Sequence, residues 1–306
     1  MLMNLQEPNV LKVRKHEVFV AREVPAATVM VTGDWHISPV VSDLQYEYLK
    51  QAISVANPDL IMLTGDIVDS PVELKRETSV RKLVRELLLC SKAAPTVMVL
   101  GSHDFITPTR PARVASRFAL PRWRSLCDKC GVTLLLDEFF ETDFLRVFGA
   151  FQDERCVLTY DKTGSLRHFD NVYEFEQKLS QFDFSSEVLS LDKANWFLSH
   201  APMVNAKVAE DLAGFDILSF GHTHGGIVPR GLDDAFDKLG VNFGLISPHK
   251  RPFAPVARGM MPVGDGSLML INGGMVGAQF AAPKTLRQLN HVKAAEVSVV
   301  EIQPES

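Results

Sequence analysis

Five short apolar segments along the chain each run into a turn that carries aspartate or histidine. The segments have the length and apolar character of strands that are buried within a sheet. In α/β sheets, functional side chains collect at the carboxyl ends of the strands. The pattern therefore predicts that the five turns lie close together in the fold, and the segments are 29–33, 60–65, 97–101, 196–199 and 217–221.

Between these segments the periodicity is that of helices, which predicts an α/β fold with crossover helices. We expect helices at 43–56, 72–91, 110–130, 173–182 and 204–213. Further strands are expected at 17–22, within 139–160, at 268–271 and at 297–302. Residues 1–306 are expected to form a single domain, with 1–27 as a leader that ends in a strand. Residues 225–266 are rich in Gly and Pro, which predicts a substrate-shaping loop.

Composition and charge narrow the classes of function. The chain has 306 residues, 46% of them hydrophobic, and a formal net charge of −5, so no basic footprint points to a nucleic-acid backbone. No segment approaches the roughly 18 apolar residues of a transmembrane helix. The first residues contain no apolar signal region. We therefore expect a cytoplasmic protein without nucleic acid as its partner, and the oligomeric state is left open.

Two of the four cysteines, Cys127 and Cys130, form a C-x-x-C pair. Such a pair suits half of a zinc site, a redox pair or two buried structural thiols. No second C-x-x-C follows, and the pair falls inside an expected helix, where both thiols share one face. The structural interpretation is favoured.

The five turns carry the ligand types of a transition-metal site. Asp34 and His36 stand two residues apart, Asp66 offers two oxygens that can bridge two cations, and three further histidines follow the last two segments: His200, His222 and His224. Mixed carboxylate and imidazole ligands suit Zn, Mn, Fe or Co rather than Ca. Glycine opens four motifs, G-D-x-H, G-D-x-x-D, G-S-H-D and G-H-T-H, where it is expected to permit a tight bend.

The order of these motifs resembles that of the calcineurin-like metallophosphoesterase superfamily over about residues 28–226. The string Gly221-His222-Thr223-His224-Gly225-Gly226 is similar to a bacterial branch that includes UDP-diacylglucosamine pyrophosphate hydrolases and related phosphodiesterases. The resemblance implies a four-layer αββα sandwich of two mixed sheets flanked by helices, with two divalent metal ions at its edge.

The resemblance also implies roles for the turn residues. Asp34, His36, Asp66 and His224 would hold one metal ion, and Asp66 would bridge to a second ion held by His200, His222 and the residue at Ser102. His103 would act on the substrate as an acid or a phosphate-binding group, with Asp104 orienting it. Asp69, which completes G-D-x-x-D, is expected to fix its loop without binding metal.

Ser102 departs from the family pattern, which usually places asparagine there as a ligand of the second metal ion. A serine side chain is shorter, and its neutral hydroxyl is a poor ligand for Zn or Mn. The consequence is a looser second site, a different metal or lower activity, unless an active enzyme tolerates the change. The intact remaining ligand positions favour tolerance.

The expected function is metal-dependent hydrolysis of a phosphoester in a small phosphorylated molecule by a water that two metal ions activate. A metal-dependent nuclease and a non-catalytic binding protein of the same fold are the alternatives. The negative net charge argues against the first, and only Ser102 favours the second. Three arginines in 225–266 are candidate phosphate contacts or solvated surface residues: Arg230, Arg251 and Arg258.

Overall fold

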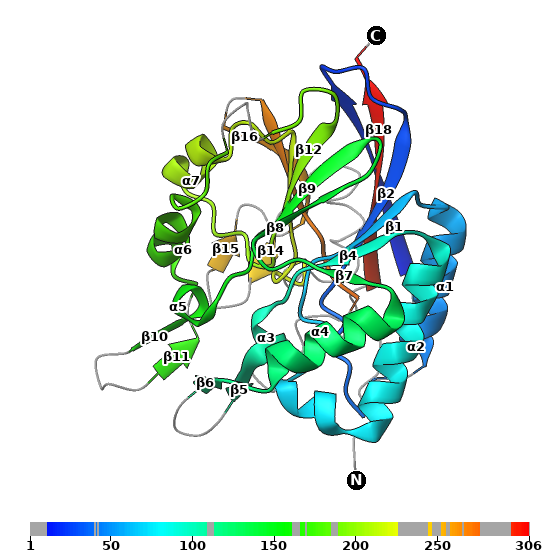
Figure 1. Ribbon diagram of the computed structural model, residues 1–306, viewed down its shortest axis with the longest axis vertical. Helices are drawn as coiled ribbons and strands as arrows, with labels where there is room; N and C mark the ends of the chain where they lie inside the picture. Colours follow the sequence, from blue (N-terminus) through cyan, green and yellow to red (C-terminus); the bar gives the residue numbers. More distant parts are fainter. Residues whose placement is uncertain are drawn as a thin grey trace.

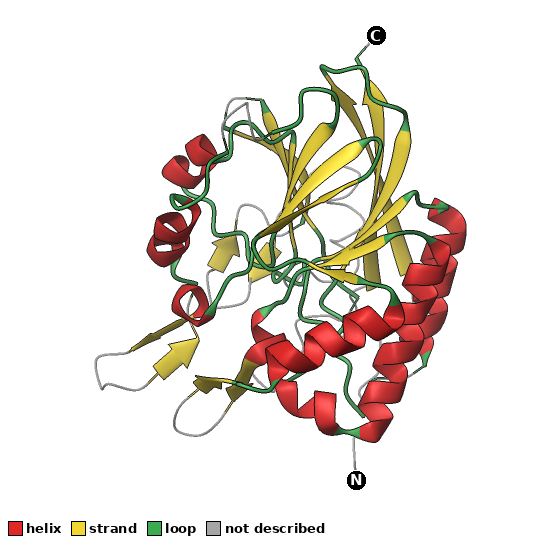
Figure 2. Ribbon diagram, viewed as in Figure 1, coloured by secondary structure: helices red, strands yellow, loops and turns green. Residues whose placement is uncertain are grey.

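Two six-stranded β-sheets lie face to face between two layers of helices in the computed structural model (Figure 2). This αββα sandwich confirms the expected architecture. The structure describes residues 11–39, 41, 43–108, 113–160, 166–168, 170–184, 189–225, 244–246, 252–254, 258–264, 266–275 and 295–305.

The first sheet has the strand order β1-β18-β2-β3-β4-β7. Its centre is a parallel set that carries three of the five predicted turns: β2 (Ala27–Thr32), β3 (Leu60–Leu63) and β4 (Thr96–Met98). The other members are β7 (Thr133–Leu134), β18 (Ala295–Pro304) and β1 (Leu11–Val20). β18 runs antiparallel to β2 and parallel to β1, so part of the expected leader is an edge strand.

The second sheet has the order β16-β17-β13-β12-β9-β8. Its four central strands are parallel: β17 (Ser267–Ile271), β13 (Ile217–Phe220), β12 (Ala194–Leu198) and β9 (Leu145–Gly149). β16 (Gly259–Val263) and β8 (Glu138–Glu141) pair antiparallel at the two edges. Three small hairpins join β5 (Ile106–Pro108) to β6 (Arg113–Ala115), β10 (Leu158–Tyr160) to β11 (Leu166–His168), and β14 (Gly244–Ile246) to β15 (Pro252–Ala254).

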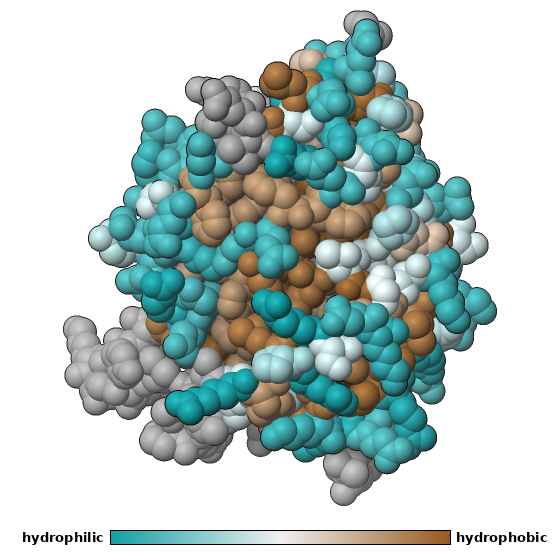
Figure 3. Space-filling view, viewed as in Figure 1, coloured by the Kyte–Doolittle hydropathy of each residue, from teal (hydrophilic) through white to brown (hydrophobic). Residues whose placement is uncertain are grey.

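Helices cover the outer face of each sheet (Figure 1). The first sheet is covered by α1 (Leu44–Ala56), α2 (Glu77–Ala93) and α4 (Ala119–Cys130), and the second by α6 (Val172–Leu179) and α7 (Ala206–Asp211). Short turns α3 (Ser102–Phe105), α5 (Glu154–Val157) and the 3-10 helix η1 (Pro71–Lys75) lie near the strand ends. Apolar surface gathers over the middle of the face shown in Figure 3, between hydrophilic margins.

Alternate side chains of the central strands face the opposite sheet or the helices. Val29 and Val31 of β2 pack with Trp196 of β12 between the sheets, whereas Met30 and Phe197 belong to the core beneath the helices. Both faces of these strands are therefore buried, which explains why their sequences are continuously apolar rather than alternating.

Two of the expected helices are wrong in part. The expected helix at 72–91 is divided, because Arg76 is extended (φ −86°, ψ 118°) between η1 and α2. The Glu73 carboxylate accepts hydrogen bonds from Arg76 and Ser79 across this break. The expected helix at 110–130 begins only at Ala119, because residues 113–115 instead pair with residues 106–108 in the β5–β6 hairpin.

Much of the expected substrate-shaping loop, including Arg230 and Arg251, lies outside the described residues. Within it the structure forms β14, β15 and β16. Arg258, directly before β16, is only 1% exposed, so its interpretation as a solvated surface residue is wrong. Among the described helices, none has the length and apolar character needed to cross a membrane.

Candidate metal centre

The ends of five strands, three from the first sheet and two from the second, bring their turns together between the sheets. The backbone N–H of His222, after β13, donates to Oδ2 of Asp34, after β2, at 3.0 Å. Nδ1 of His200, after β12, lies 2.8 Å from the carbonyl oxygen of Thr64, after β3. Contacts between segments this distant in sequence show that the predicted convergence of turns is correct.

Six of the predicted ligands form two compact groups. The first triad is Asp34, His36 and His224, and the second triad is Asp66, His200 and His222. Within each triad, ligand atoms lie within 4.8 Å of one another, and all six residues are buried. Nε2 of His36 lies 3.3 Å from Nε2 of His224, and Nε2 of His200 lies 3.1 Å from Nδ1 of His222.

The Asp66 carboxylate belongs to the second triad and also faces the first. Its Oδ2 is 3.2 Å from Nε2 of His200 and 3.8 Å from Nε2 of His36. Its Oδ1 accepts a hydrogen bond from the backbone N–H of His103 at 2.8 Å. One oxygen thus faces both groups of imidazoles, which is the placement that a bridging carboxylate requires.

The imidazole partners favour bound cations in this centre. A carbonyl oxygen only accepts hydrogen bonds, so Nδ1 of His200 carries the proton and its Nε2 bears a lone pair. That lone pair faces Nδ1 of His222 at 3.1 Å. Two nitrogen lone pairs at this spacing repel each other unless a proton or a cation lies between them. Neutral imidazoles with carboxylates are suitable ligands for Zn, Mn, Fe or Co.

The electrostatics of the centre also stabilise positive charge. Burial disfavours ionisation of Asp66, but the neighbouring His200 and His103 hold its carboxyl pKa well below the usual value. Burial similarly disfavours the charged form of His200, yet the Asp66 charge raises the His200 pKa to about 10. The carboxylate therefore attracts a proton to its neighbour, and a divalent cation can take the place of that proton.

Five of the six triad residues adopt left-handed backbone conformations. The φ angles are 50° at Asp34, 46° at His36, 50° at Asp66, 69° at His222 and 50° at His224. Such angles are uncommon outside glycine and collect at functional sites, where they aim side chains that ordinary backbone would direct elsewhere. The turns thus carry local strain in order to present their donors.

The explanation of the four motif glycines needs correction. Gly65 does have a positive φ of 90°, but Gly33, Gly101 and Gly221 do not. These three are required for close approach. A Cβ at Gly101 would lie 2.2 Å from Oδ1 of Asp66, and one at Gly221 would lie 2.8 Å from Oδ2 of Asp34. The bend is made mostly by the ligand residues themselves.

Ser102 is the first residue of α3 and is 3% exposed. Its Oγ has no hydrogen-bond partner within the described part of the chain. A buried hydroxyl without a partner is unfavourable unless a water or an ion satisfies it. Its neighbour His103 donates its backbone N–H to Asp66, so this hydroxyl lies in the turn that contacts the Asp66 carboxylate.

The expected role of Asp104 as the residue that orients His103 is wrong. Nδ1 of His103 instead donates to the backbone carbonyl of Asp69 at 2.8 Å, which leaves Nε2 available. The Asp104 carboxylate accepts from the backbone N–H groups of Ile67, Val68 and Gly101 at 2.9–3.0 Å. Asp104 therefore fixes the two turns to each other, and the backbone carbonyl of Asp69 orients His103. The Asp69 side chain also places its Oδ1 3.8 Å from Nδ1 of His36.

Two residues near the centre were missed by the sequence analysis. Gln152, after β9, exchanges two hydrogen bonds of 2.7 Å with the backbone of Ala201, the residue after His200. Asp170 places Oδ2 3.4 Å from Nε2 of His222. Gln152 could have been found, because it follows an apolar strand as the other turn residues do. No motif marks Asp170.

The four cysteines are buried and free of disulfides, which confirms the structural interpretation of Cys127 and Cys130 on α4. Burial raises the pKa of the Cys127 thiol, as expected for an inert side chain.

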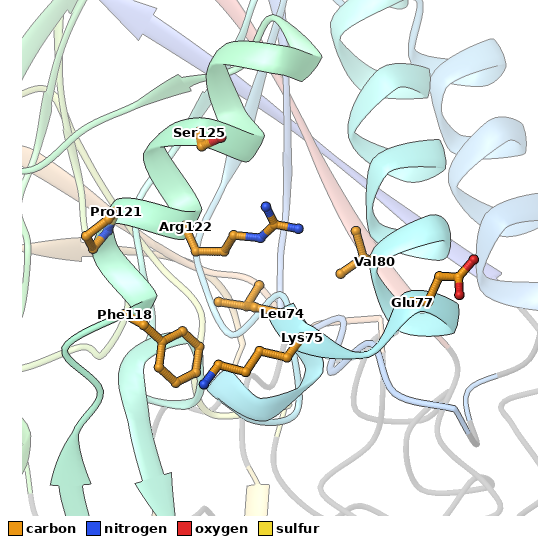
Figure 4. Close-up of a pocket in the computed structure, with 8 residues that line it drawn as sticks. All are labelled: Leu74, Lys75, Glu77, Val80, Phe118, Pro121, Arg122 and Ser125. Atoms are coloured by element: carbon orange, nitrogen blue, oxygen red, sulfur yellow. The ribbon is translucent and has the colours of Figure 1, made fainter.

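A separate cavity of about 850 Å³ opens between η1, α2 and α4 (Figure 4). Leu74 and Phe118 supply apolar walls, and the side chains of Lys75 and Arg122 extend beside them. None of its lining residues belongs to the two triads. The chemistry that the turns assemble is therefore not located at this cavity.

Comparisons with known proteins agree with the strand-end centre. The profile of the family described as calcineurin-like phosphoesterase matches residues 27–226, which span all six triad residues. An uncharacterized metallophosphoesterase from Aquifex aeolicus (strain VF5) is 24% identical over 222 residues, 71% of each chain.

Two solved structures are also similar to this chain. One is phosphopantetheinyl hydrolase from Mycobacterium tuberculosis, at 11% identity and a TM-score of 0.43 over 91% of this chain and 96% of that one. The other is a dimetal phosphatase from Danio rerio, at 11% identity and a TM-score of 0.42 over 85% and 90%. On the family match, this chain belongs to the calcineurin-like phosphoesterases and is a metal-dependent hydrolase of phosphoester bonds.

Proposed function

We propose that this protein hydrolyses a phosphoester of a small phosphorylated metabolite, nucleotide or nucleotide-sugar with two divalent metal ions. The observation that carries the proposal is the pair of buried triads joined by the Asp66 carboxylate. Asp34, His36 and His224 would hold one ion, His200 and His222 the other, and Asp66 both. Ser102 would complete the second site through its hydroxyl or a water.

Two bound divalent ions supply Lewis acidity for the phosphate ester and activation of the attacking water. The residues contribute positioning and proton transfer. His103 is held through Nδ1–H by the Asp69 carbonyl, so Nε2 is the atom that takes up a second proton and can then pass it to the leaving oxygen. Asp104 keeps the two turns that carry His103 and Asp66 at a fixed separation through three backbone hydrogen bonds.

A small substrate and a cytoplasmic location complete the proposal. The net charge of −5 supports a substrate other than nucleic acid, since a backbone-binding groove requires clustered basic residues. The four unpaired cysteines support a reducing compartment.

The test combines metal analysis with turnover of three substrates. The purified protein is dialysed against Mn²⁺ or Zn²⁺, its metal content is measured, and p-nitrophenyl phosphate, bis-p-nitrophenyl phosphate and single-stranded DNA are offered. Two ions per chain with hydrolysis of either small ester is the expected result, and the ratio of the two rates gives the monoester or diester preference.

Other outcomes of this test contradict the proposal in distinct ways. DNA cleavage without hydrolysis of the small esters would identify a nuclease. Bound metal with no turnover of any substrate would identify a binding protein that keeps the fold without the chemistry. Fewer than two ions at saturating metal would exclude the dinuclear arrangement.

A further inference from the structure

Asp170 lies in none of the sequence motifs, yet its carboxylate reaches the second triad. Its Oδ2 lies 3.4 Å from Nε2 of His222. The other ring nitrogen of His222, Nδ1, lies 3.1 Å from Nε2 of His200. Asp170 and His200 therefore contact the two different ring nitrogens of His222.

The backbone beside Asp170 is firmly held. The N–H of Asn171 donates to the carbonyl of Cys156 at 2.7 Å, and the Asn171 side chain accepts from the N–H of Glu174 at the start of α6. Phe175 anchors that helix in the core with a fully buried ring. Asp170 is thus placed by a capped and packed helix start, which fixes where its carboxylate can go.

The chemistry of this contact determines which nitrogen of His222 can bind a cation. A carboxylate only accepts hydrogen bonds, so Nε2 of His222 carries the proton that faces Asp170. Nδ1 then bears the lone pair that faces His200. The Thr64 carbonyl acts in the same way on Nδ1 of His200, which leaves Nε2 of His200 with the lone pair that can bind a cation. Asp170 and the Thr64 carbonyl therefore determine the orientation and the tautomer of the two imidazoles of the second triad, each through the ring nitrogen that faces away from the metal site.

The charges around the centre support the same assignment. Two divalent cations carry four positive charges, whereas Asp34 and Asp66 supply two negative charges. Asp69, beside His36, and Asp170, beside His222, are the carboxylates next to the outer ring nitrogens. Each triad therefore has one outer carboxylate, which adds negative charge beside one of its imidazoles.

We propose that Asp170 is a positioning residue for the second metal ion, acting through the His222 ring. This inference rests on the proposed function, because it concerns one of the two ions assigned there. Asp170 holds Nδ1 of His222 toward His200 and Asp66 by accepting a hydrogen bond from Nε2–H, which fixes the orientation and the tautomer of the ring.

The first experiment measures metal affinity without any substrate. Metal-free wild-type protein, Asp170→Asn and a control, Asp192→Asn, are titrated with Mn²⁺ in a calorimeter. Asp192 is an exposed carboxylate just before the start of β12, at the strand end opposite His200. In Asp170→Asn we expect one of the two ions to bind about 10–100-fold more weakly and the other to change less than twofold. The control is expected to match the wild type at both sites.

A second readout separates positioning from general support of the fold. Fully loaded Co²⁺ forms of the wild type and Asp170→Asn are compared by their visible absorption spectra. A reoriented His222 ring changes the ligand field, so the bands are expected to shift. A residue that only supports the fold would lower the melting temperature and leave the spectrum of the folded, loaded protein unchanged.

Two results would overturn the inference: Mn²⁺ affinities in Asp170→Asn within twofold of wild type at both sites, or an unchanged Co²⁺ spectrum. If Asp170→Asn does not fold, Asp170→Glu, which keeps the charge on a longer side chain, takes its place. We then expect one ion to bind at least threefold more weakly, and unchanged binding of both ions would overturn the inference. Wild-type protein that binds fewer than two Mn²⁺ ions would instead contradict the proposed function.

Discussion

The two halves of the sandwich contribute different chemistry to the centre. The half built on the first sheet provides Asp34 and Asp66 together with His36, whereas the second sheet provides the imidazoles of His200, His222 and His224. The same half also buries carboxyl groups in its helical segments, Glu86 in α2 and Glu73 in η1.

The core of the second half is rich in phenylalanine. The rings of Phe148, Phe184, Phe215 and Phe197 form a chain of contacts with centroids 5.0–5.5 Å apart. Edge-to-face rings at this spacing pack well and have defined orientations. The comparison indicates that the first half supplies both carboxylates of the two triads, whereas the second half supports three of the four imidazoles with a packed aromatic core.

Asp66→Ala should have the largest effect, because this residue belongs to both sites. We expect loss of about 4 kcal/mol of transition-state stabilisation, roughly a thousandfold in kcat/KM, and the lowest metal content of any single ligand variant. Steady-state kinetics and metal analysis after dialysis measure both. His224→Ala, which alters the first triad alone, is the matched comparison. Equal activity in Asp66→Ala would remove the bridging role.

The buried carboxyl of the first half should make stability depend on pH. Burial raises the pKa of Glu86 on α2 to about 7, although Arg85 opposes the shift. The folded protein keeps the proton that the unfolded chain releases near its ordinary pKa, so stability is highest below that value and falls as the pH rises toward 7. The decrease is on the order of 3 kcal/mol.

Glu86→Gln should remove the contribution of this carboxyl to the decrease. The difference in melting temperature between the variant and the wild type is expected to be larger at pH 8 than at pH 5, in favour of the variant. Thermal melts at both values provide the measurement, and Glu77→Gln, at an exposed position of the same helix, is the control. A difference that does not change with pH would show that Glu86 is ionised in the folded protein.

Gln152→Ala tests the stiffness of the second half. The variant loses both hydrogen bonds to Ala201. The Ala201 carbonyl keeps the N–H of Met203 as a donor, but the buried Ala201 N–H loses the acceptor that Gln152 provides, so we expect a loss of about 2 kcal/mol in the free energy of unfolding. Because Ala201 follows His200, metal affinity should fall with it. Urea unfolding and Mn²⁺ titration measure the two effects, with the exposed Gln181→Ala as the control. Loss of stability with unchanged Mn²⁺ affinity would show that the hydrogen bonds of Gln152 stabilise the fold but do not position His200 for metal binding.

Ser102→Asn should have the smallest effect and acts on the second ion. An amide oxygen reaches farther than a hydroxyl and is a better neutral ligand. The second ion is therefore expected to bind more tightly by about 1 kcal/mol, which raises the occupancy of its site at limiting Mn²⁺. Metal content after dialysis is the measurement, and Ser102→Ala is the control. If Ser102→Asn and wild type have the same stoichiometry, Ser102 does not limit the second site.

The centre was largely predictable because its signals are local. Each apolar strand is followed within a few residues by its own donor, and parallel strands place their carboxyl ends on one side of the sheet. Asp34 and Asp66 could therefore be placed together at the end of one sheet, and His200 and His222 at the end of the other, before the fold was known. The meeting of two different sheets came from the family resemblance and could not be derived from strand periodicity.

What could not be predicted depends on contacts between distant segments. Asp104 was expected to orient His103 because the two are adjacent, but three backbone N–H groups occupy its carboxylate. Asp170 reaches His222 only because α6 packs beside the second sheet. The break at Arg76 likewise depends on Glu73, whose hydrogen bonds form in the folded chain. Side-chain partners of this kind leave no periodic pattern.

The pairing of β2 has a consequence for how the protein is made. β2 leads into Asp34 and His36, and one of its two neighbours is β18, formed by residues 295–304. Until the ribosome has released those residues, one side of β2 presents unpaired backbone groups that can associate with other nascent chains. A chain that stalls or is cut before residue 295 retains every predicted metal-binding side chain and still lacks the strand that protects β2 from aggregation.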